Sequence, residues 1–555
     1  MKTGGNIVVD SLAAAGVTAV FAVHGVQIDP IFQACADTSG TSAPVALVDV
    51  RHEASAGFAA EAYARVNSTV GAVAVCPGPG FTNVLTSIAN ARVDRTPVVY
   101  VVGSTPATTQ ETNGLQVGLD HVAIVAPVAK WACRVATGAN LGRIVVQAIR
   151  IATTAPRGPV LLDIPADILA TAAVENIAGA QAVSTIWAGI GADDVQHCLD
   201  LLAAAERPVL AIGYSPTRAG RAAVVAFVAR TGIPCFAEYG AIGMLADDDP
   251  AYGGTLYQLG RLPADTRPDV LLAIGVRFGF DTPGLRDGGV GWGTKVLHID
   301  SDPAEIGRFA PPAHGIVADP DRALDALATA AAGRSWNVTT TWPDAVRDAR
   351  AQTRSELDDI APTDGERLHP YAAARAVSDA AAASDAVLIG DGAVCKHWLH
   401  DALRLPLGAI YLTHGRFGCM GTGFGMAVGA AFAAPGRPVL CATGDGAAGF
   451  AIGEFETMIR HQLPVTVVVF NNARWGASQG FQLRPDGPKR IVGTTLSDAG
   501  YHDVMKAFGG RGVRVNTIDA LHAELADALA RPTPTCINVN TNSVGLAPEI
   551  PQLNS

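Results

Sequence analysis

The sequence predicts an α/β protein of three domains, each built on a doubly wound parallel sheet. Short apolar runs rich in β-branched residues alternate with alanine-rich stretches of helical character along the chain. Most of these runs are continuously apolar, which is typical of parallel strands buried on both faces. Two stretches, residues 170–188 and 334–370, lack this rhythm and read as linkers. They divide the 555 residues into three parts, consistent with about 150 residues per domain.

Each predicted domain contains several of these apolar runs. The first domain, residues 1–170, has expected strands at residues 19–23, 45–50, 71–76, 98–102 and 160–164. The middle domain, residues 189–333, has them at 208–212, 270–274 and 296–299, and no cofactor is expected there because no G-x-G-x-x-G follows its first strand. The third domain, residues 371–555, has them at 386–389, 410–413, 439–443, 465–470 and 535–539. A shared topology for the first and third domains is left open.

Composition excludes several classes of protein. The net charge is −11 and no basic run occurs, so nucleic-acid binding is not expected. No uninterrupted apolar stretch reaches the length of a membrane span, and the first residues lack the apolar region of a signal peptide. The nine cysteines form no C-x-x-C pair, which favours reduced thiols in the cytoplasm. Charged residues make up only 16% of the chain, which is consistent with surface covered by another subunit.

A polar pattern follows two neighbouring strands of the third domain. Gly444, Asp445, Gly446 and Ala447 come directly after the strand at 439–443, and Asn472 follows the next strand, 27 positions after Asp445. Small residues after a strand let backbone N–H groups approach a phosphate. A carboxylate and an amide oxygen at adjacent strand ends suit Mg²⁺, whose shell phosphate, a backbone carbonyl and water would complete. An ordinary tight turn explains Gly-Asp-Gly alone, but not the added asparagine.

A second pattern lies in the first domain. Glu53 follows the strand at 45–50 at the point where a helix begins, among the small residues Ala54, Ser55, Ala56 and Gly57. Such a carboxyl is expected to be desolvated and to have a raised pKa. The alternative is an acidic residue that interacts with the helix dipole.

The two patterns together resemble the cofactor-binding motif of the thiamine diphosphate-dependent enzymes, in which Gly-Asp-Gly is followed at a similar distance by Asn-Asn. The resemblance implies that Mg²⁺ is ligated by Asp445, Asn472 and the backbone carbonyl of Arg474. It also implies that Glu53 bonds N1′ of the aminopyrimidine ring of thiamine diphosphate. Residues implied around the diphosphate are Gly392, Ala393, Val394, Gly444, Gly446 and Ala447.

Two further segments agree with this resemblance. Gly78 and Asn83 belong to a Gly-Pro-Gly-Phe-Thr-Asn loop that would line the same cofactor, although alone it is a generic turn. Gly418 and Met420 resemble the segment that holds the cofactor bent, with a core methionine as the alternative for Met420. Because Glu53 and Asp445 come from different subunits in this superfamily, the resemblance implies an obligate homodimer with shared active sites, commonly a homotetramer.

Within the superfamily the chain resembles the benzaldehyde lyases along nearly its whole length. Stretches that carry this resemblance include Ile31–Cys35, Arg51–Ala54, Ala155–Asp163 and Ile452–Phe455. These enzymes cleave and form aromatic 2-hydroxy ketones without decarboxylation. The resemblance therefore implies a carbon–carbon lyase or carboligase whose substrate is an aldehyde or a 2-hydroxy ketone.

The predicted substrate face departs from that pattern. Gln27 stands where those lyases have a histidine and Arg416 where they have a tyrosine, whereas Gln116, expected to bond a substrate oxygen, is retained. Because a guanidinium prefers anions and other acceptors, a substrate more polar than benzoin is expected, unless Arg416 is an interface ion-pair partner. Gln27 can orient a hydroxyl but cannot take its proton, so His24 and His414 are the remaining acid–base candidates, unless they are structural.

Rival functions share the cofactor apparatus. A 2-oxoacid decarboxylase or an acetolactate synthase-like enzyme needs a site for a carboxylate, which Arg416 would provide. A 2-hydroxyacyl-CoA lyase is a further alternative.

Overall fold

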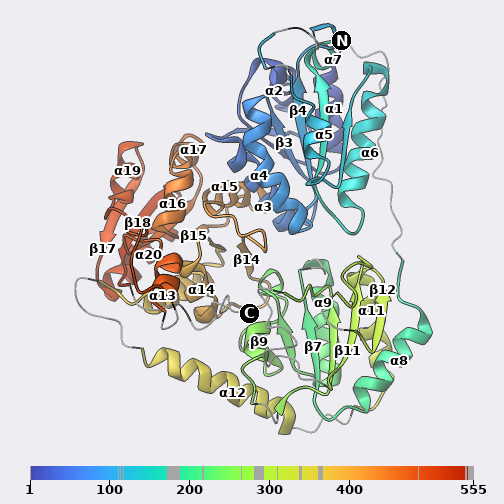
Figure 1. The fold of residues 1–555 in the computed structure, drawn as a ribbon, viewed down its shortest axis with the longest axis vertical. Coiled ribbons are helices and arrows are strands. Elements are labelled where there is room, and N and C mark those ends of the chain that lie inside the picture. The colour runs from blue at the N-terminus through green and yellow to red at the C-terminus, as the bar shows by residue number, and fades with distance from the viewer. Residues whose placement is uncertain are drawn as a thin grey trace.

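The computed structural model describes residues 2–543 and residue 547, apart from residues 110, 111, 113, 117, 172–187, 215–217, 264–265, 280–292, 309–310, 337–340, 361–366 and 485–486. Within these residues the chain forms three six-stranded sheets in which every strand pairing is parallel. Figure 1 shows the sheets as three separate lobes with helices packed on their faces. The predicted fold class is confirmed. None of the described helices is long and apolar enough to cross a membrane.

The first lobe has the strand order β2-β1-β3-β4-β6-β5. Its strands are β1 (Ala19–Ala22), β2 (Ala46–Asp49), β3 (Gly71–Val75), β4 (Val98–Ser104), β5 (Trp131–Arg134) and β6 (Val160–Pro165). Its helices are α1 (Gly4–Ala14), α2 (Asp29–Asp37), α3 (Glu53–Asn67), α4 (Pro79–Val93), α5 (His121–Val125), α6 (Leu141–Thr153) and α7 (Ala166–Ala170). The order reverses between β1 and β3, and open α/β sheets bind ligands at such a point.

The third lobe repeats that topology with the order β14-β13-β15-β16-β18-β17. Its strands are β13 (Val387–Gly390), β14 (Ile410–Thr413), β15 (Val439–Gly444), β16 (Val465–Asn471), β17 (Arg511–Val515) and β18 (Thr535–Asn540). Its helices are α13 (Pro370–Ser384), α14 (Val394–Ala402), α15 (Gly423–Ala433), α16 (Asp445–Ala451), α17 (Glu454–Arg460), α18 (Gly476–Leu483), α19 (Tyr501–Ala507) and α20 (Ile518–Leu529). Its reversal between β13 and β15 lies where residues 391–394 and 444–447 leave the sheet.

The middle lobe has the order β12-β11-β10-β7-β8-β9, which is that of dinucleotide-binding sheets. Its strands are β7 (Pro208–Ile212), β8 (Cys235–Ala237), β9 (Tyr252–Thr255), β10 (Val270–Ile274), β11 (Lys295–Asp300) and β12 (His314–Val317). Its helices are α8 (Ala192–Ala203), α9 (Arg221–Thr231), α10 (Leu256–Leu259) and α11 (Pro320–Ala331).

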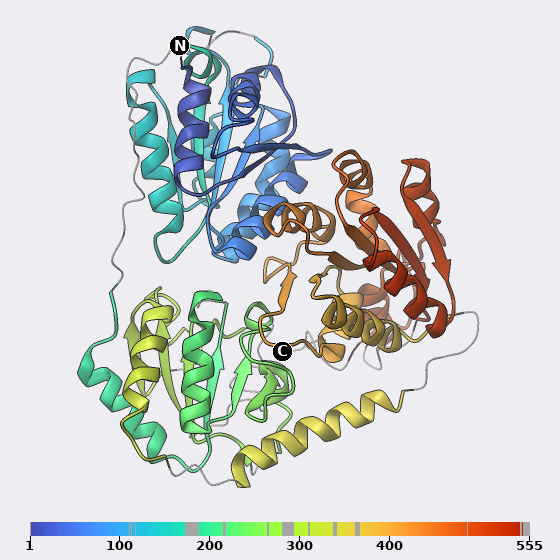
Figure 2. The ribbon, with the colours of Figure 1, turned by 180° about the vertical axis from the view of Figure 1, so that it is seen from behind.

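The second predicted linker contains a long helix, α12 (Thr341–Asp358), which Figures 1 and 2 show beneath the middle and third lobes. Trp342 is buried, and its indole nitrogen donates to the Pro208 carbonyl at 2.9 Å. Arg350 and Arg354 both bind Asp247 of the middle lobe. The linker prediction is therefore wrong for this helix, whose mostly polar sequence contains three buried apolar residues, Trp342, Val346 and Leu357. In the first predicted linker, residues 172–187 lie outside the described residues.

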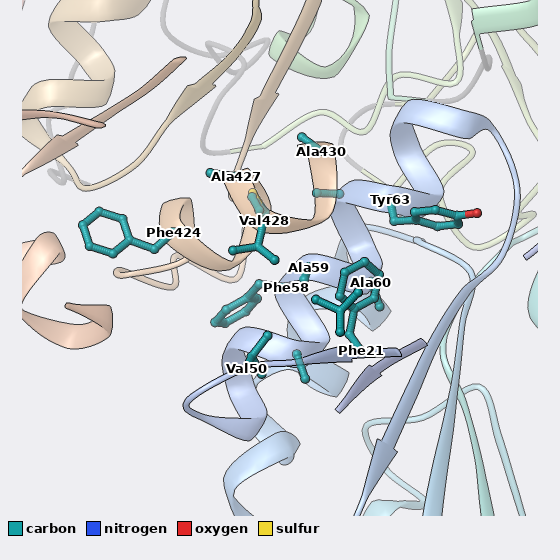
Figure 3. Close-up of a cluster of buried hydrophobic side chains, with 14 of the residues drawn as sticks. Phe21, Val50, Phe58, Ala59, Ala60, Tyr63, Phe424, Ala427, Val428 and Ala430 are labelled. Carbon is teal, nitrogen blue, oxygen red and sulfur yellow. The ribbon is translucent and has the colours of Figure 1, made fainter. Parts of the chain in front are cut away.

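The first and third lobes are joined by helices α3 and α15, which cross in direct contact. Figure 3 shows Phe58 and Ala59 of α3 lying against Ala427 and Val428 of α15. A Cβ atom on Gly429 would stand 2.0 Å from the carbonyl oxygen of Ala59. Glycine is thus what allows the two backbones to approach each other, and this contact sets how the two lobes of one chain are arranged.

Candidate active site

A groove at the carboxyl edge of the third sheet brings together most of the predicted cofactor residues. It has about 690 Å³ of empty volume including its open mouth, and its lining residues all belong to residues 370–542. The predicted residues that line it are Gly392, Ala393, Val394, Met420, Gly444, Asp445, Gly446, Ala447, Asn472 and Arg474. The helix α14 begins at this groove, so its first N–H groups are available to an anion there.

Asp445 and Asn472 are the two predicted metal-ligating side chains that line the groove. Asp445 is 3% exposed, and burial raises the pKa of its carboxyl to about 6 despite a hydrogen bond from the Arg474 backbone N–H at 3.1 Å. Asn472 Oδ1 is buried without a hydrogen-bond partner in the described part of the chain. A desolvated carboxylate beside an unsatisfied amide oxygen is a donor set that a hard cation would satisfy.

Asp391, which the sequence analysis missed, organises the rim of this groove. It is fully buried and accepts hydrogen bonds from the backbone N–H groups of Gly392, Gly421 and Gly423 at 2.7, 3.2 and 3.1 Å. Its carboxylate therefore joins the loop after β13 to the loop that carries Met420. Its position directly after a strand and before Gly392 was the available signal.

The predicted segment around Met420 is an open loop. Gly418 has φ +76°, a conformation that favours glycine, and a Cβ atom there would meet nothing within 4 Å. The Met420 side chain lines the groove and is 39% exposed. It is therefore not the core methionine of the alternative interpretation.

His414 lies behind the groove and does not line it. Its Nε2 is 3.4 Å from the Gly392 carbonyl oxygen, and its Nδ1 is 3.2 Å from that of Gly415. Burial, together with the neighbouring Lys396 charge, lowers the pKa of His414 to about 3. The ring is therefore uncharged at neutral pH. Its two contacts with backbone carbonyls support a structural role, and its acid–base role stays a prediction.

Glu53 lies in a second cluster, on the first lobe. It is the first residue of α3, is half-buried, and accepts a hydrogen bond from Asn83 Nδ2 at 3.0 Å. A Cβ atom on Gly80 would stand 3.5 Å from Glu53 Oε1 and 3.4 Å from Cys76 Cβ. Of the small residues expected around Glu53, Ser55, Ala56 and Gly57 are buried, but the Glu53 side chain keeps partial exposure, so the expected desolvation is incomplete in a single chain.

Gln27 and Gln116 meet at the edge of this cluster. Gln27 Nε2 donates to Gln116 Oε1 at 2.7 Å. Gln116 has φ +62°, and a Cβ atom on Gly78 would stand 3.3 Å from Gln116 Cβ. Cys76, also missed by the sequence analysis, lies beside both Gln27 and Glu53, and burial raises the pKa of its thiol.

His24 and Arg416 have partners within the chain. His24 is exposed, its Nε2 lies 3.5 Å from Asp29 Oδ1, and its ring meets Phe32 edge-on. Arg416 Nη2 donates to Glu238 Oε1 of the middle lobe at 2.7 Å, and the Glu238 side chain is 1% exposed. The geometry of Arg416 matches the interface ion pair left open above, and its role toward a substrate stays a prediction.

At the carboxyl edge of the middle sheet, acidic side chains are already paired with an arginine of the first lobe. Arg95 of the first lobe forms ion pairs with Asp300 and Asp302, each at 2.9 Å, at the end of β11. A Cβ atom on Gly213 would stand 1.9 Å from the Gly275 carbonyl oxygen at the reversal of strand order. The absence of a cofactor from this domain stays a prediction.

Comparisons with known proteins agree with this arrangement. Models of thiamine pyrophosphate enzymes match the chain in three places: the N-terminal TPP binding domain at residues 2–124, the central domain at 195–327 and the C-terminal TPP binding domain at 390–539. The chain belongs to the thiamine pyrophosphate enzyme family. Thiamine pyrophosphate is the cofactor called thiamine diphosphate above.

Relatives of this thiamine pyrophosphate enzyme span almost its whole length. It is 31% identical to a probable acetolactate synthase of Mycobacterium bovis, over 97% of this chain and 95% of the relative. It is 29% identical to the oxalyl-CoA decarboxylase of Escherichia coli K12, with the same coverage. It is 28% identical to 2-hydroxyacyl-CoA lyase 2 of Danio rerio, over 96% of this chain and 90% of the relative. The finer resemblance to benzaldehyde lyases stays a prediction.

The residues present fit the family's cofactor. Gly392 has φ +82°, a conformation that favours glycine, and a Cβ atom there would be in contact with the Gly444 nitrogen at 3.4 Å in this wall of the groove. The unsatisfied oxygen of Asn472 and the desolvated carboxyl of Asp445 complete the fit for a magnesium diphosphate. The groove and the Glu53 cluster are formed by different lobes, and no residue of the first lobe lines the groove.

Proposed function

We propose that this enzyme, with thiamine diphosphate and Mg²⁺, cleaves or forms the bond between the carbonyl carbon and the hydroxyl-bearing carbon of a 2-hydroxy ketone. The observation that carries the proposal is the substrate-side pair Gln27–Gln116, whose amides are neutral and bonded to each other at 2.7 Å. Such amides offer donors to a carbonyl oxygen and acceptors to a hydroxyl. The expected polarity of the substrate now rests on this pair, since Arg416 is bound to Glu238.

The cofactor supplies a carbon nucleophile and an electron sink when it is bound. The chain's own residues do the rest. Asp445, Asn472 and the carbonyl of Arg474 would hold Mg²⁺, and Met420 would support the bent cofactor. Glu53, held by Asn83, would bind and polarise its aminopyrimidine ring, and Gln116 with Gln27 would orient the substrate oxygens.

A second candidate is supported by the relatives. An acetolactate synthase, an oxalyl-CoA decarboxylase and a 2-hydroxyacyl-CoA lyase match this chain over at least 96% of its length. A 2-oxoacid decarboxylase or synthase would need a cation for the substrate carboxylate. Arg416, the residue expected to supply it, already has Glu238 as a counter-ion, which is why the lyase is preferred.

The proposal includes a homodimer with shared active sites, and assembly into a homotetramer. Exposed apolar side chains support it, because they gather at both clusters. Val26 and Leu115 are each 81% exposed beside Gln27 and Gln116, and Phe450 is 64% exposed near the groove. Pairing the Glu53 cluster of one subunit with the groove of another would bury these side chains and desolvate Glu53. The nine free cysteines support a cytoplasmic location.

A substrate panel tests the function. The purified enzyme is assayed with thiamine diphosphate and Mg²⁺ on benzoin, acetoin, benzoylformate, pyruvate and a 2-hydroxyacyl-CoA thioester. Higher kcat/KM for a 2-hydroxy ketone than for every 2-oxoacid and thioester is expected, and the reverse order would refute the proposal. Glu53→Gln serves as the control, because it keeps an oxygen for Asn83 and should remove about 10²- to 10⁴-fold of any activity that belongs to this site.

A further inference from the structure

The loop of residues 414–421 joins β14 to α15 and carries Gly418 and Met420. Phe417 is 47% exposed and Met420 39% exposed, whereas Cys419 between them packs against the core shared by the first and third lobes. Gly418, with φ +76°, has open space around it. Besides Cys419, the loop is held at its two ends, and Asp391 binds the far end at Gly421.

The near end is held by a carboxylate of the first lobe. Asp94 is the C-cap residue of α4 and is 7% exposed. Its Oδ2 accepts a hydrogen bond from the Gly415 backbone N–H at 3.0 Å. A Cβ atom on Gly415 would stand 1.7 Å from Asp94 Oδ1, so residue 415 has to be glycine for this contact to form. A buried, charge-assisted hydrogen bond of this kind is strong and directional.

The next residue of the loop is held by a carboxylate of the middle lobe. Glu238 Oε1 accepts from Arg416 Nη2 at 2.7 Å. The same carboxylate is fixed by two backbone N–H groups at the end of the middle sheet, those of Tyr214 at 3.1 Å and Arg277 at 3.3 Å. Because the carboxylate is itself immobilised, it transmits the position of the middle sheet to Arg416.

We propose that Asp94 and Glu238 are positioning residues that set the Met420 loop for the coenzyme, so that the first and middle lobes of a chain control coenzyme binding in the groove of its third lobe. The inference rests on the proposed contact of Met420 with the cofactor. It gives the middle lobe a function that needs no ligand of its own. The two carboxylates act on residues 415 and 416, which are consecutive, so losing either one frees the same end of the loop.

Ordinary interdomain adhesion is the competing explanation, and the chain offers a matched control for it. Asp302 also binds the first lobe to the middle lobe, through Arg95 at 2.9 Å, but within the described part of the chain it forms no hydrogen bond or ion pair with residues 414–421. If the carboxylates only hold lobes together, removing Asp302 should act like removing Glu238. If they position the loop, removing Asp302 should leave coenzyme binding unchanged.

The test compares Asp94→Ala, Glu238→Ala and Asp302→Ala in the full-length enzyme. The Kd for thiamine diphosphate at saturating Mg²⁺ is measured by quenching of tryptophan fluorescence, with no substrate present, so the outcome does not depend on which substrate the enzyme uses. We expect the Kd to rise at least fivefold in the first two variants and less than twofold in the third. A smaller rise in either of the first two, or an equal rise in Asp302→Ala, would overturn the proposal.

The conservative variants guard against misfolding. Asp94→Asn and Glu238→Gln keep an oxygen acceptor for Gly415 and Arg416. The increase in log Kd over the wild type should therefore be at most half of that in the corresponding alanine variant. A merely structural defect would instead track the thermal unfolding midpoint of each variant. The proposal would be contradicted if, across all five variants, the Kd for the coenzyme correlated with the unfolding midpoint and not with the presence of the oxygen acceptor.

Discussion

Asp445 and Asn472 are two polar side chains whose interactions within the chain are incomplete. The Asp445 carboxyl is desolvated, and Asn472 Oδ1 has no hydrogen-bond partner among the described residues. Burying such groups without a partner costs free energy. We therefore predict that a bound cation stabilises the groove by giving the Asn472 oxygen a partner.

Asn472→Ala tests this at the residue scale. It removes the unsatisfied oxygen, so the Mg²⁺ concentration needed for half-maximal coenzyme binding should rise about tenfold to a hundredfold, the range seen when even outer groups of a metal site are lost. Titration of Mg²⁺ against the coenzyme-induced fluorescence change measures it. Asn67→Ala, at an exposed position of α3, is the control. An unchanged Mg²⁺ requirement would exclude Asn472 as a ligand.

His414 gives a prediction for the dependence of stability on pH. Burial beside Lys396 lowers its pKa to about 3, against 6.5 for an exposed histidine. Below pH 6.5 the unfolded chain therefore binds a proton that the folded chain cannot, and stability falls as the pH falls, by about 1.4 kcal/mol for each pH unit. Urea unfolding of the coenzyme-free protein at pH 7.5 and 5.5 should show His414→Gln losing about 1.4 kcal/mol less than the wild type. Equal losses would contradict the prediction.

Local sequence patterns predicted some of these residues and could not predict others. Asp445 and Asn472 directly follow strands, and parallel strand ends meet at one edge, so their spacing predicts that they lie close together. Gly392 was expected only from the family resemblance. Arg416 and Glu238 are 178 positions apart, and nothing near either residue shows that they pair. That is why the sequence left open whether Arg416 faces a substrate or an internal carboxylate.

At the scale of elements, burial decided which strands could be predicted. The central strands are buried along their whole length and appear in the sequence as apolar runs. Four of the five strands that were missed, β5, β9, β12 and β17, lie at the edges of their sheets. Edge strands need an apolar surface on fewer sides, and β12 alternates between buried and exposed residues, so its sequence has no continuous run. The helix α12 was missed because only three of its residues are buried, so its sequence also has little apolar pattern.

The contact of α3 with α15 gives a prediction at this scale. The Cβ atom of Gly429→Ala would collide with the backbone of Ala59, which cannot move as a flexible side chain can. The helices must separate, at a cost of about 1–3 kcal/mol. Gly449→Ala is the control, because this exposed helical glycine has its nearest neighbour at 4.0 Å and should gain up to about 1 kcal/mol in helix propensity. Denaturant unfolding of both variants measures the difference, and equal stabilities would contradict the packing argument.

At the scale of the whole molecule, each chain carries two half-sites that do not meet. The groove is lined by the third lobe alone, and the Glu53 cluster belongs to the first lobe. The α3–α15 contact holds these lobes together within a chain, and we propose that a second copy supplies the missing half of each site. The sequence suggested a shared site only through the family resemblance. Local sequence patterns do not show how the lobes of one chain are arranged in space.

Mixing two inactive variants tests the shared site. Glu53→Gln and Asp445→Asn each damage a different half-site, so each homodimer should have almost no activity. A mixed dimer would join the intact Glu53 of one chain to the intact Asp445 of the other in one of its two sites. Random pairing of equal amounts makes half of the dimers mixed, so the unseparated protein should have about a quarter of the wild-type activity and the isolated mixed dimer about half. The two variants are co-expressed, each with a different affinity tag. The dimer that carries both tags is then isolated and assayed. A mixed dimer as inactive as its parents would show that both groups serve the same subunit's site.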